Sequence, residues 1–252
     1  MKLGLILVAG ASAWAATCDS VSKAPLKQGR ITLAIEVAAG AFTPAQGNPA
    51  PYKNLPVFCR VSATLTPTSD SDIKIEVWLP LAPAWNKDLQ SVGNGAWAGS
   101  ISYTAMATAL AAGYATASTD TGHTGNTAEF AFGHPEKFND FGYRAIHEMT
   151  VAAKAIAAAF YGSAPAHSYF NGCSTGGRQA LTEAQRYPAD YDGIIAGAPA
   201  IYASRLQGMQ VWANQMAHAS EDSYIPPEKY RAIHDEVLAV CDAVDGVKDG
   251  TL

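Results

Sequence analysis

The stretch Asn171-Gly172-Cys173-Ser174-Thr175-Gly176-Gly177-Arg178 decides the fold that we expect for this chain. It contains Gly-x-Ser-x-Gly, a sharp strand-to-helix turn that presents a nucleophilic serine. Residues 167–170 before it favour a strand, and residues 178–186 after it favour a helix. Because the motif requires this strand–turn–helix context, we interpret Ser174 as a nucleophile. The alternative is a serine that only caps the following helix.

Alternating strands and helices surround this turn. Apolar and polar residues alternate over 57–66 and 72–79, which predicts an antiparallel hairpin. The patterns also predict strands from Leu89, at 114–118 and at 192–199, the last one buried, and helices at 104–112 and 143–160. The longest helix has an apolar stripe of Ile146, Met149, Ala153, Ile156 and Phe160. This order predicts an α/β-hydrolase fold, with a mostly parallel sheet flanked by helices.

Three segments follow from these patterns. Residues 1–15 contain one basic residue, a short apolar run and an Ala-Trp-Ala cleavage box, which predicts a signal peptide rather than a buried strand. Residues 16–203 are expected to form the N-terminal part of the catalytic domain. The alternation stops after about Ser204, and we interpret 204–252 as the start of an inserted lid domain. A signal peptide implies a secreted or periplasmic protein, in which disulfides persist.

The composition restricts the classes of partner. The formal net charge is −5, and 16 basic residues against 22 acidic ones remain once Lys2 leaves with the signal peptide. Basic residues are neither clustered nor interleaved with aromatic ones, so nucleic acid is not an expected partner. No later segment has the roughly 18 continuous apolar residues of a membrane helix. A small-molecule substrate is the expected partner.

A serine nucleophile needs a histidine base and an acid that orients it, and in this fold both follow the serine. Only 78 residues follow Ser174, and they include His218 and His234. Both lie in helix-like segments rather than in a loop after a late strand, so we interpret them as helix-surface residues. We therefore expect the N-terminal part of a longer enzyme, inactive in isolation, with the triad Asp and His supplied by a C-terminal half or a C-terminal chain.

Two backbone N–H groups must face the charge that develops on the substrate oxygen. One is expected from Thr175, which directly follows the nucleophile. The other is expected from the glycine-rich loop 93–96 after an early strand, with Gly95 as the first choice and Ala96 as the next. The alternative is that this loop is an ordinary tight turn.

The chain contains four cysteines, Cys18, Cys59, Cys173 and Cys241. Cys18 and Cys59 can pair and tie the mature N-terminus to an early strand, whereas pairing of Cys173 with Cys241 is only an open alternative. Cys173 is not the favoured nucleophile, because the turn presents its third residue, Ser174. It does not fit a phosphatase loop either, because four residues separate it from Arg178 where that loop needs five. A disulfide role is expected for Cys173.

Three segments, Gly172–Gln179, Tyr191–Ala200 and Cys241–Gly250, resemble the tannase and feruloyl esterase family. The similarity runs from about Cys18 to Leu252. The resemblance implies that Cys173 pairs with a cysteine directly after the triad histidine, and that the triad Asp, His and this cysteine lie beyond Leu252. It also implies serine esterase activity on aromatic acyl esters such as ferulates, gallates or terephthalate monoesters.

The segment Cys241–Gly250 is similar to the calcium loop of that family. Three carboxylates, those of Asp242, Asp245 and Asp249, fall within eight residues among glycines, and such hard oxygen ligands suit Ca²⁺. Their spacing is not that of an EF-hand. The resemblance implies that the backbone carbonyls of Val247 and Thr251 complete a structural site, and Cys241 is expected to pair with a cysteine soon after Leu252. The alternative is a solvated acidic loop.

Asp120, His123 and His134 fall in loops that a substrate could reach, but structural polar residues with satisfied hydrogen bonds are the favoured interpretation. The sequence as a whole predicts a secreted carboxylic ester hydrolase with Ser174 as its nucleophile. The competing hypothesis is a non-catalytic chain, either a degraded remnant or a subunit whose site is completed by a second polypeptide.

Overall fold

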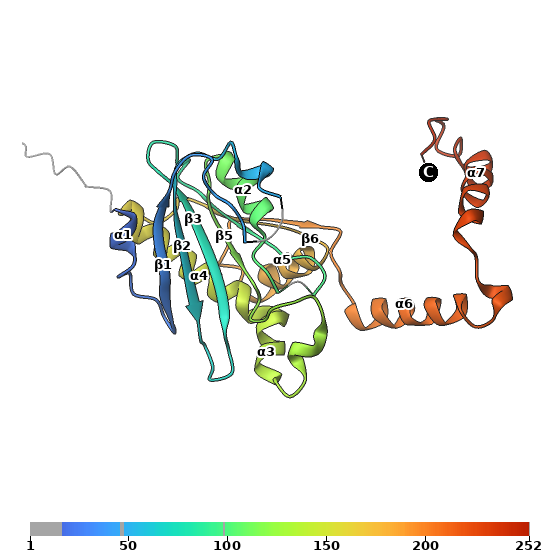
Figure 1. Cartoon of the computed structure of the whole chain (residues 1–252), viewed down its shortest axis with the longest axis horizontal. Coiled ribbons are helices and arrows are strands. Elements are labelled where there is room, and N and C mark those ends of the chain that lie inside the picture. Colours follow the sequence, from blue (N-terminus) through green and yellow to red (C-terminus); the bar gives the residue numbers. More distant parts are fainter. Residues whose placement is uncertain (1–16, 46–47, 98, 252) are drawn as a thin grey trace, which may run out of the picture. The chain divides into compact units, whose positions relative to one another are not determined.

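The computed structural model describes residues 17–45, 48–97 and 99–251 (Figure 1). The predicted signal peptide therefore lies outside the described residues. The chain divides into two compact units, of which the first ends at Ala200 and the second begins at Ile201. The assignment of residues 204–252 to a lid stays a prediction. Among the described helices, none combines the length and apolar character needed to cross a bilayer.

Seven strands form one sheet in the first unit. They are β1 (Gly29–Val37), β2 (Phe58–Leu65), β3 (Ile73–Pro80), β4 (Leu89–Val92), β5 (Ala115–Thr119), β6 (Ser168–Cys173) and β7 (Gly193–Gly197). Their spatial order is β1-β2-β3-β5-β4-β6-β7. Pairing is antiparallel from β1 to β5 and parallel from β5 through β4 and β6 to β7. The α/β class and the predicted hairpin, now β2 and β3, are confirmed.

Helices are the other regular elements of the described residues. They are α1 (Cys18–Val21), α2 (Tyr103–Ala111), α3 (Pro135–Asn139), α4 (Ala145–Tyr161), α5 (Thr175–Arg186), α6 (Ala203–Ala217) and α7 (Tyr230–Cys241). Single turns of 3-10 helix occur at Ala50–Tyr52, Ala128–Ala131, Glu221–Ser223 and Pro227–Lys229, and a π-helical turn occurs at Asp140–Arg144. Only α6, α7 and the last two 3-10 turns belong to the second unit.

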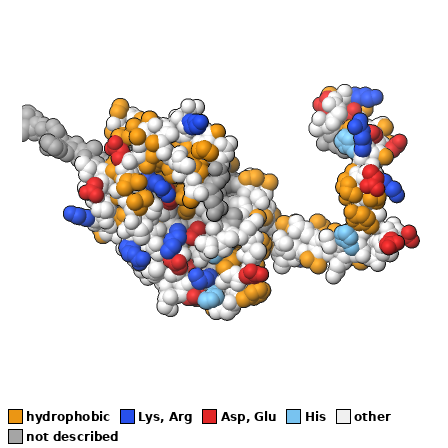
Figure 2. Space-filling model, viewed as in Figure 1, with side chains coloured by type: hydrophobic (Ala, Val, Ile, Leu, Met, Phe, Trp, Pro, Cys, Tyr) orange, Lys and Arg blue, Asp and Glu red, His pale blue; other side chains and the backbone are white. Residues whose placement is uncertain are grey.

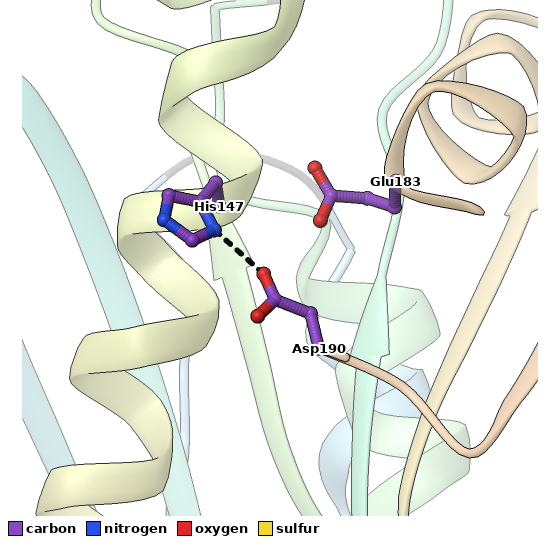
Figure 3. Close-up of side chains that lie close together, drawn as sticks. All are labelled: His147, Glu183 and Asp190. Atoms are coloured by element: carbon purple, nitrogen blue, oxygen red, sulfur yellow. Dashed lines mark hydrogen bonds and ion pairs between the residues drawn. The ribbon is translucent and has the colours of Figure 1, made fainter. Parts of the chain in front are cut away.

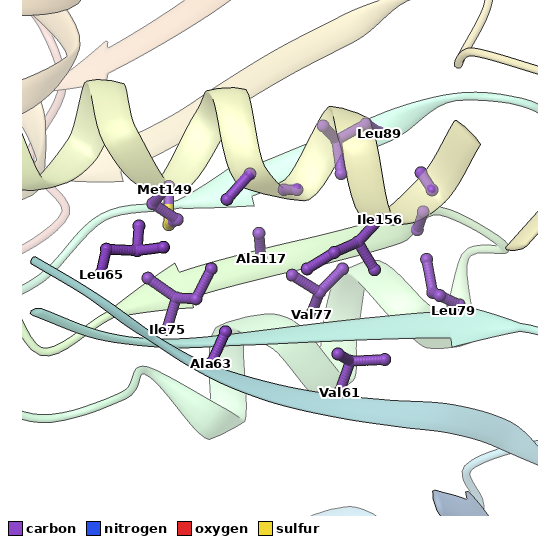
Figure 4. Packing of buried hydrophobic residues seen from close by; sticks show 14 of the residues in the cluster. Val61, Ala63, Leu65, Ile75, Val77, Leu79, Leu89, Ala117, Met149 and Ile156 are labelled. Carbon is purple, nitrogen blue, oxygen red and sulfur yellow. The ribbon is translucent and has the colours of Figure 1, made fainter. Parts of the chain in front are cut away.

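The core lies on the two faces of the sheet. Helix α4 packs across the strands, with Ile156 and Met149 facing Val77 and Ile75 (Figure 4). Every residue of the predicted apolar stripe on α4 is at most 3% exposed. Helix α2 packs in a separate buried cluster that includes the ring of Trp78. Side chains alternate along β3, so Trp78 points to the face opposite to that of Val77. The sheet is thus covered on both sides, as the α/β class requires.

Strand β7 differs from its prediction. Residues 192–199 were expected to form a buried strand, but Ile195 in β7 is 63% exposed. The physical reason is position, because β7 is the last strand in the sheet order and pairs with β6. An apolar run in a sequence does not distinguish an edge strand from a central one.

A disulfide ties the start of the described chain to the sheet. Cys18 in α1 and Cys59 in β2 are bonded, with their Cα atoms 5.4 Å apart. Both residues are buried within the same core cluster that α4 covers. The predicted Cys18–Cys59 pair is therefore confirmed.

Candidate active site

Ser174 occupies the turn between β6 and α5. Its backbone angles, φ 61° and ψ −118°, are ones that side-chain-bearing residues rarely adopt. It holds the N-cap position of α5, but its side chain makes no capping hydrogen bond, so the interpretation as a mere helix cap is not supported. Its N–H donates to the Gly197 carbonyl, and its own carbonyl accepts from the Ala200 N–H, both at 3.0 Å. These two hydrogen bonds fix the backbone at Ser174, whose side chain is exposed.

Glycines surround the turn because neighbouring backbone leaves no space for a side chain. A Cβ on Gly172 would lie 2.3 Å from the Gly176 carbonyl oxygen, and one on Gly177 would lie 2.3 Å from the Gly197 carbonyl oxygen. A Cβ on Gly93 would lie 2.6 Å from the Gly176 Cα. The glycine-rich loop after β4 and the start of α5 are therefore in direct backbone contact.

Hydrogen bonds clamp that loop onto α5. Thr175 Oγ1 donates to the Ala96 carbonyl at 2.9 Å. The Asn94 N–H donates to Gln179 Oε1 at 3.0 Å, and Gln179 Nε2 donates back to Asn94 Oδ1 at 3.2 Å. Both of these side chains are buried. Asn94 and Gln179, which are 85 positions apart, thus bring the predicted loop beside Thr175. The sequence patterns assigned no role to either side chain.

The two predicted oxyanion donors are at this junction. Thr175 is the first residue of α5, where a backbone N–H has no partner within the helix. Gly95 is exposed, and none of the hydrogen bonds between described residues uses its backbone N–H. Ala96 is likewise exposed and has φ 47°, which bends the loop sharply.

Trp97, which directly follows the glycine-rich loop, packs against another aromatic ring. The Trp97 ring stacks on Phe141 with centroids 5.0 Å apart, and the Trp97 carbonyl accepts from His123 Nε2 at 2.7 Å. Burial lowers the pKa of His123, which favours the neutral ring. Arg178 of α5 donates to the Gly142 carbonyl at 2.7 Å, so the π-helical turn is also tied to the helix that follows Ser174.

The three loop residues singled out from the sequence line one cavity of about 510 Å³ in the first unit. They are Asp120, His123 and His134. Asp120 is buried and its Oδ1 accepts from the N–H groups of Lys74 and Gly122 at 2.9 and 2.8 Å. Burial raises the pKa of Asp120 to about 7. In Figure 2, acidic, basic and histidine side chains lie side by side at the end of the first unit near α3.

No histidine of the first unit is paired with Ser174. His123 bonds to Trp97, His134 to Asp70, His147 to Asp190 and His167 to Asp88. His218 directly follows α6 and His234 lies within α7, in agreement with the helical interpretation. Within the first unit, as far as it is described, no histidine is therefore hydrogen-bonded to Ser174.

Two cysteines carry free thiols in the described chain. Cys173, beside Ser174, and Cys241, at the end of α7, are both exposed. Because Cys173 lies in the first unit and Cys241 in the second, the alternative of a bond between them stays open.

The predicted calcium residues form a short folded loop in the second unit. The carboxylate of Asp242 is buried and its Oδ1 accepts from the N–H groups of Asp249 and Gly250 at 3.2 and 2.8 Å. Asp245 and Asp249 each accept from the N–H two residues later, at Val247 and Thr251. Carboxylate oxygens are the hard donors that suit Ca²⁺, so the residue types fit that ion by their chemistry. Among the described residues, however, the oxygens of Asp242, Asp245 and Asp249 do not form a group within 4.8 Å of one another.

Comparison with known proteins agrees with this geometry. The family model for tannase and feruloyl esterase matches residues 59–252. The chain belongs to the tannase and feruloyl esterase family. An uncharacterised esterase of Xanthomonas campestris pv. campestris is 42% identical over 98% of the chain, which covers 42% of that protein. A probable feruloyl esterase B-2 of Aspergillus terreus is 34% identical over the whole chain, which covers 49% of that protein.

Solved structures of the family share the fold. Feruloyl esterase B from Aspergillus oryzae superimposes with a TM-score of 0.85 at 34% identity, over 92% of this chain and 47% of that one. Tannin acyl hydrolase from Aspergillus niger gives a TM-score of 0.73 at 26% identity, over 93% of this chain and 45% of that one. The chain thus spans about half the length, or somewhat less, of the relatives that it matches.

Proposed function

We propose that this protein is a secreted or periplasmic carboxylic ester hydrolase that works through an acyl-enzyme on Ser174. The observation that carries the proposal is the turn itself, in which a strained, exposed serine lies at the start of α5 without capping that helix. The naming of the family relatives as esterases supports the reaction class.

In the proposed mechanism, Ser174 Oγ attacks the ester carbonyl carbon and the alcohol leaves after proton transfer. The N–H groups of Thr175 and Gly95, with Ala96 as the next candidate, stabilise the negative oxygen of the tetrahedral intermediate. A histidine outside the described residues takes the proton from Ser174 and returns it to the leaving alcohol. Water then releases the acid from the acyl-enzyme.

Family resemblance supplies two further elements of the proposal. Cys173 is proposed to bond to a cysteine beside that histidine, which would join the base to the nucleophile. The acyl group is proposed to be aromatic, as the feruloyl and tannin names of the relatives suggest. The stacked rings of Trp97 and Phe141 beside the glycine-rich loop are consistent with an aromatic acyl group.

The acidic loop is proposed to bind a structural Ca²⁺. The carboxylates of Asp242, Asp245 and Asp249 and the carbonyls of Val247 and Thr251 would hold it. Its role would be to neutralise three carboxylates that crowd one short loop, with no part in the ester chemistry.

The test of the ester mechanism uses Ser174→Ala and, as a matched exposed serine, Ser163→Ala. Each chain is co-expressed with the part of the Xanthomonas relative that it does not align with, and hydrolysis of methyl ferulate and p-nitrophenyl esters is followed. We expect turnover in the wild-type and Ser163→Ala complexes, and a loss of about 10⁴-fold or more in kcat for Ser174→Ala.

Two outcomes would contradict the proposal. Turnover that survives in the Ser174→Ala complex would remove Ser174 from the mechanism. A wild-type complex that forms but stays inert towards both ester classes would favour the non-catalytic hypothesis.

A further inference from the structure

A second group of reactive side chains lies between α4, α5 and the turn that leads to β7 (Figure 3). His147 comes from α4, Glu183 from α5 and Asp190 from the turn. One nitrogen or oxygen atom from each lies within 4.8 Å of the others. Glu183 is nine residues beyond Ser174, about 13 Å along the helix, so this group is separate from the nucleophile.

Glu183 is the anomaly in this group. Its side chain is 0% exposed, and neither carboxylate oxygen has a hydrogen-bond partner among the described residues. Figure 3 shows its carboxylate directed towards His147 and Asp190. A buried carboxylate that accepts no hydrogen bond is costly, and such a group in a folded protein calls for a ligand.

The neighbouring basic groups do not bond to Glu183, and burial raises the pKa of its carboxyl to about 8. His147 Nδ1 lies 2.7 Å from Asp190 Oδ2, so the imidazole is already committed to the other carboxylate. Lys154 donates to the backbone carbonyl of Asp190 rather than to a carboxylate. A divalent cation can be bound by the imidazole and both carboxyl groups at once.

We propose that His147, Glu183 and Asp190 bind a divalent transition metal of the Zn²⁺ type. One imidazole nitrogen and two carboxylate oxygens form a donor set that suits Zn²⁺, with water completing four-coordination. Ligand atoms about 2.0–2.2 Å from one ion lie at most about 4.4 Å apart, so small side-chain rotations close the observed group around a metal. The His147 and Asp190 side chains are 26% and 15% exposed, which leaves the ion a path from solvent.

The surroundings suit a structural metal. The Tyr187 ring stacks on His147 with centroids 3.9 Å apart and fixes the imidazole plane. The metal would join α4, α5 and the turn before β7. Because α5 starts beside Ser174, and Gly197 of β7 accepts from the Ser174 N–H, the metal would stiffen both supports of the nucleophile without touching it.

The test uses the purified chain with its free thiols alkylated and with Ca²⁺ in excess, so that Cys173, Cys241 and the acidic loop do not take up the probe. After removal of bound metal, ZnCl₂ is titrated by calorimetry, and CoCl₂ binding is followed by its visible spectrum. The variants are Glu183→Gln and His147→Gln. The matched control is His167→Gln, because His167 pairs with Asp88 at 3.2 Å at an exposed site.

We expect one equivalent of Zn²⁺ in the wild type and in His167→Gln, and an affinity at least tenfold weaker in Glu183→Gln and His147→Gln. Zn²⁺ should raise the melting temperature of the wild type and not that of Glu183→Gln. Equal Zn²⁺ affinity in the wild type and Glu183→Gln would overturn the proposal. If both ligand variants fail to fold, the wild type still decides, because a Co²⁺ spectrum that stays that of the aqueous ion also overturns it.

Discussion

The first unit and the acidic loop of the second unit use aspartate and glycine in opposite ways. In the first unit, Asp120 accepts from the N–H of Lys74, which is 46 residues away. In the second unit, Asp242 accepts from the N–H groups of Asp249 and Gly250, which are seven and eight residues away. The first arrangement exists only when distant segments are assembled, whereas the second is built within one short stretch.

The glycines show the same contrast. Gly177 and Gly93 are required because backbone from distant segments passes within 2.3 and 2.6 Å of where their Cβ atoms would be. Gly246 and Gly250 have open space around them and are required only by their φ values of 94° and 78°. Tertiary contact dictates glycine in one region and local backbone conformation dictates it in the other.

The largest expected effect that sharpens this contrast is a pH dependence set by Asp120. Its folded-state pKa of about 7 is above the ordinary value of 3.8, so the folded state holds this proton more tightly than the unfolded state does. The contribution is complete below about pH 4 and is lost as the pH rises towards 7, by up to about 4 kcal/mol. Asp120→Asn keeps an accepting oxygen and should flatten this part of the curve, as measured by urea unfolding from pH 4 to 8. An unchanged slope in Asp120→Asn would contradict the assignment.

A smaller loss is expected from filling the tight turn. Gly177→Ala places a Cβ against the Gly197 carbonyl oxygen and should reduce the free energy of unfolding by about 3 kcal/mol. Gly208→Ala is the matched control, since Gly208 lies within α6 with no atom near its Cβ position. This control should be neutral or should stabilise by up to about 1 kcal/mol, because alanine favours helix. Denaturant unfolding of both variants shows whether the loss of stability comes from the steric contact at Gly177 or from replacing glycine by alanine in general.

Calcium should affect the acidic loop by a comparable amount. Ca²⁺ at a hundred times its Kd is expected to stabilise the folded second unit by about 2.7 kcal/mol, because only the folded loop binds it. The measurement is the melting temperature of chelator-treated protein before and after adding Ca²⁺, in a Glu183→Gln background so that the proposed second metal site does not contribute. Asp249→Asn should reduce the shift. The absence of any shift in the parent background would exclude a bound ion at this loop.

The smallest expected effect concerns the nucleophile itself. Ser174 holds φ 61°, which costs a serine more than a glycine. Ser174→Gly should therefore raise the free energy of unfolding of the chain by about 1 kcal/mol, and under the proposed mechanism it should remove turnover in the co-expressed complex. A loss of stability in Ser174→Gly would show that the serine side chain contributes contacts that outweigh its backbone strain.

The elements that were predictable are those with local signals. The antiparallel pairing of β2 with β3 and the apolar stripe of α4 were confirmed, although Glu76 on the polar face of β3 is buried. The strand β1 was not identified, although Ile31, Leu33 and Ile35 alternate, and its burial in the structure is only partial. Local pattern thus identified the central elements better than the edges of the sheet.

The candidate site was predictable only in part, for the same reason. The turn motif carries its own signal, so Ser174 and Thr175 could be named from the sequence. The clamp of Asn94 on Gln179 spans 85 positions and carries no local pattern. The group formed by His147, Glu183 and Asp190 likewise appears only after α4 and α5 pack, because its spacing matches no short metal motif.

Strand β7 has a practical consequence for work with this chain. It ends the sheet of the described first unit, with Ile195 largely exposed. A bare strand edge with an apolar side chain is a template onto which other extended chains add. We therefore expect aggregation of the isolated chain to depend on the β7 edge of the sheet rather than on its buried core. Dilute samples, or a fused segment that pairs with β7, are the conditions under which its chemistry is best measured.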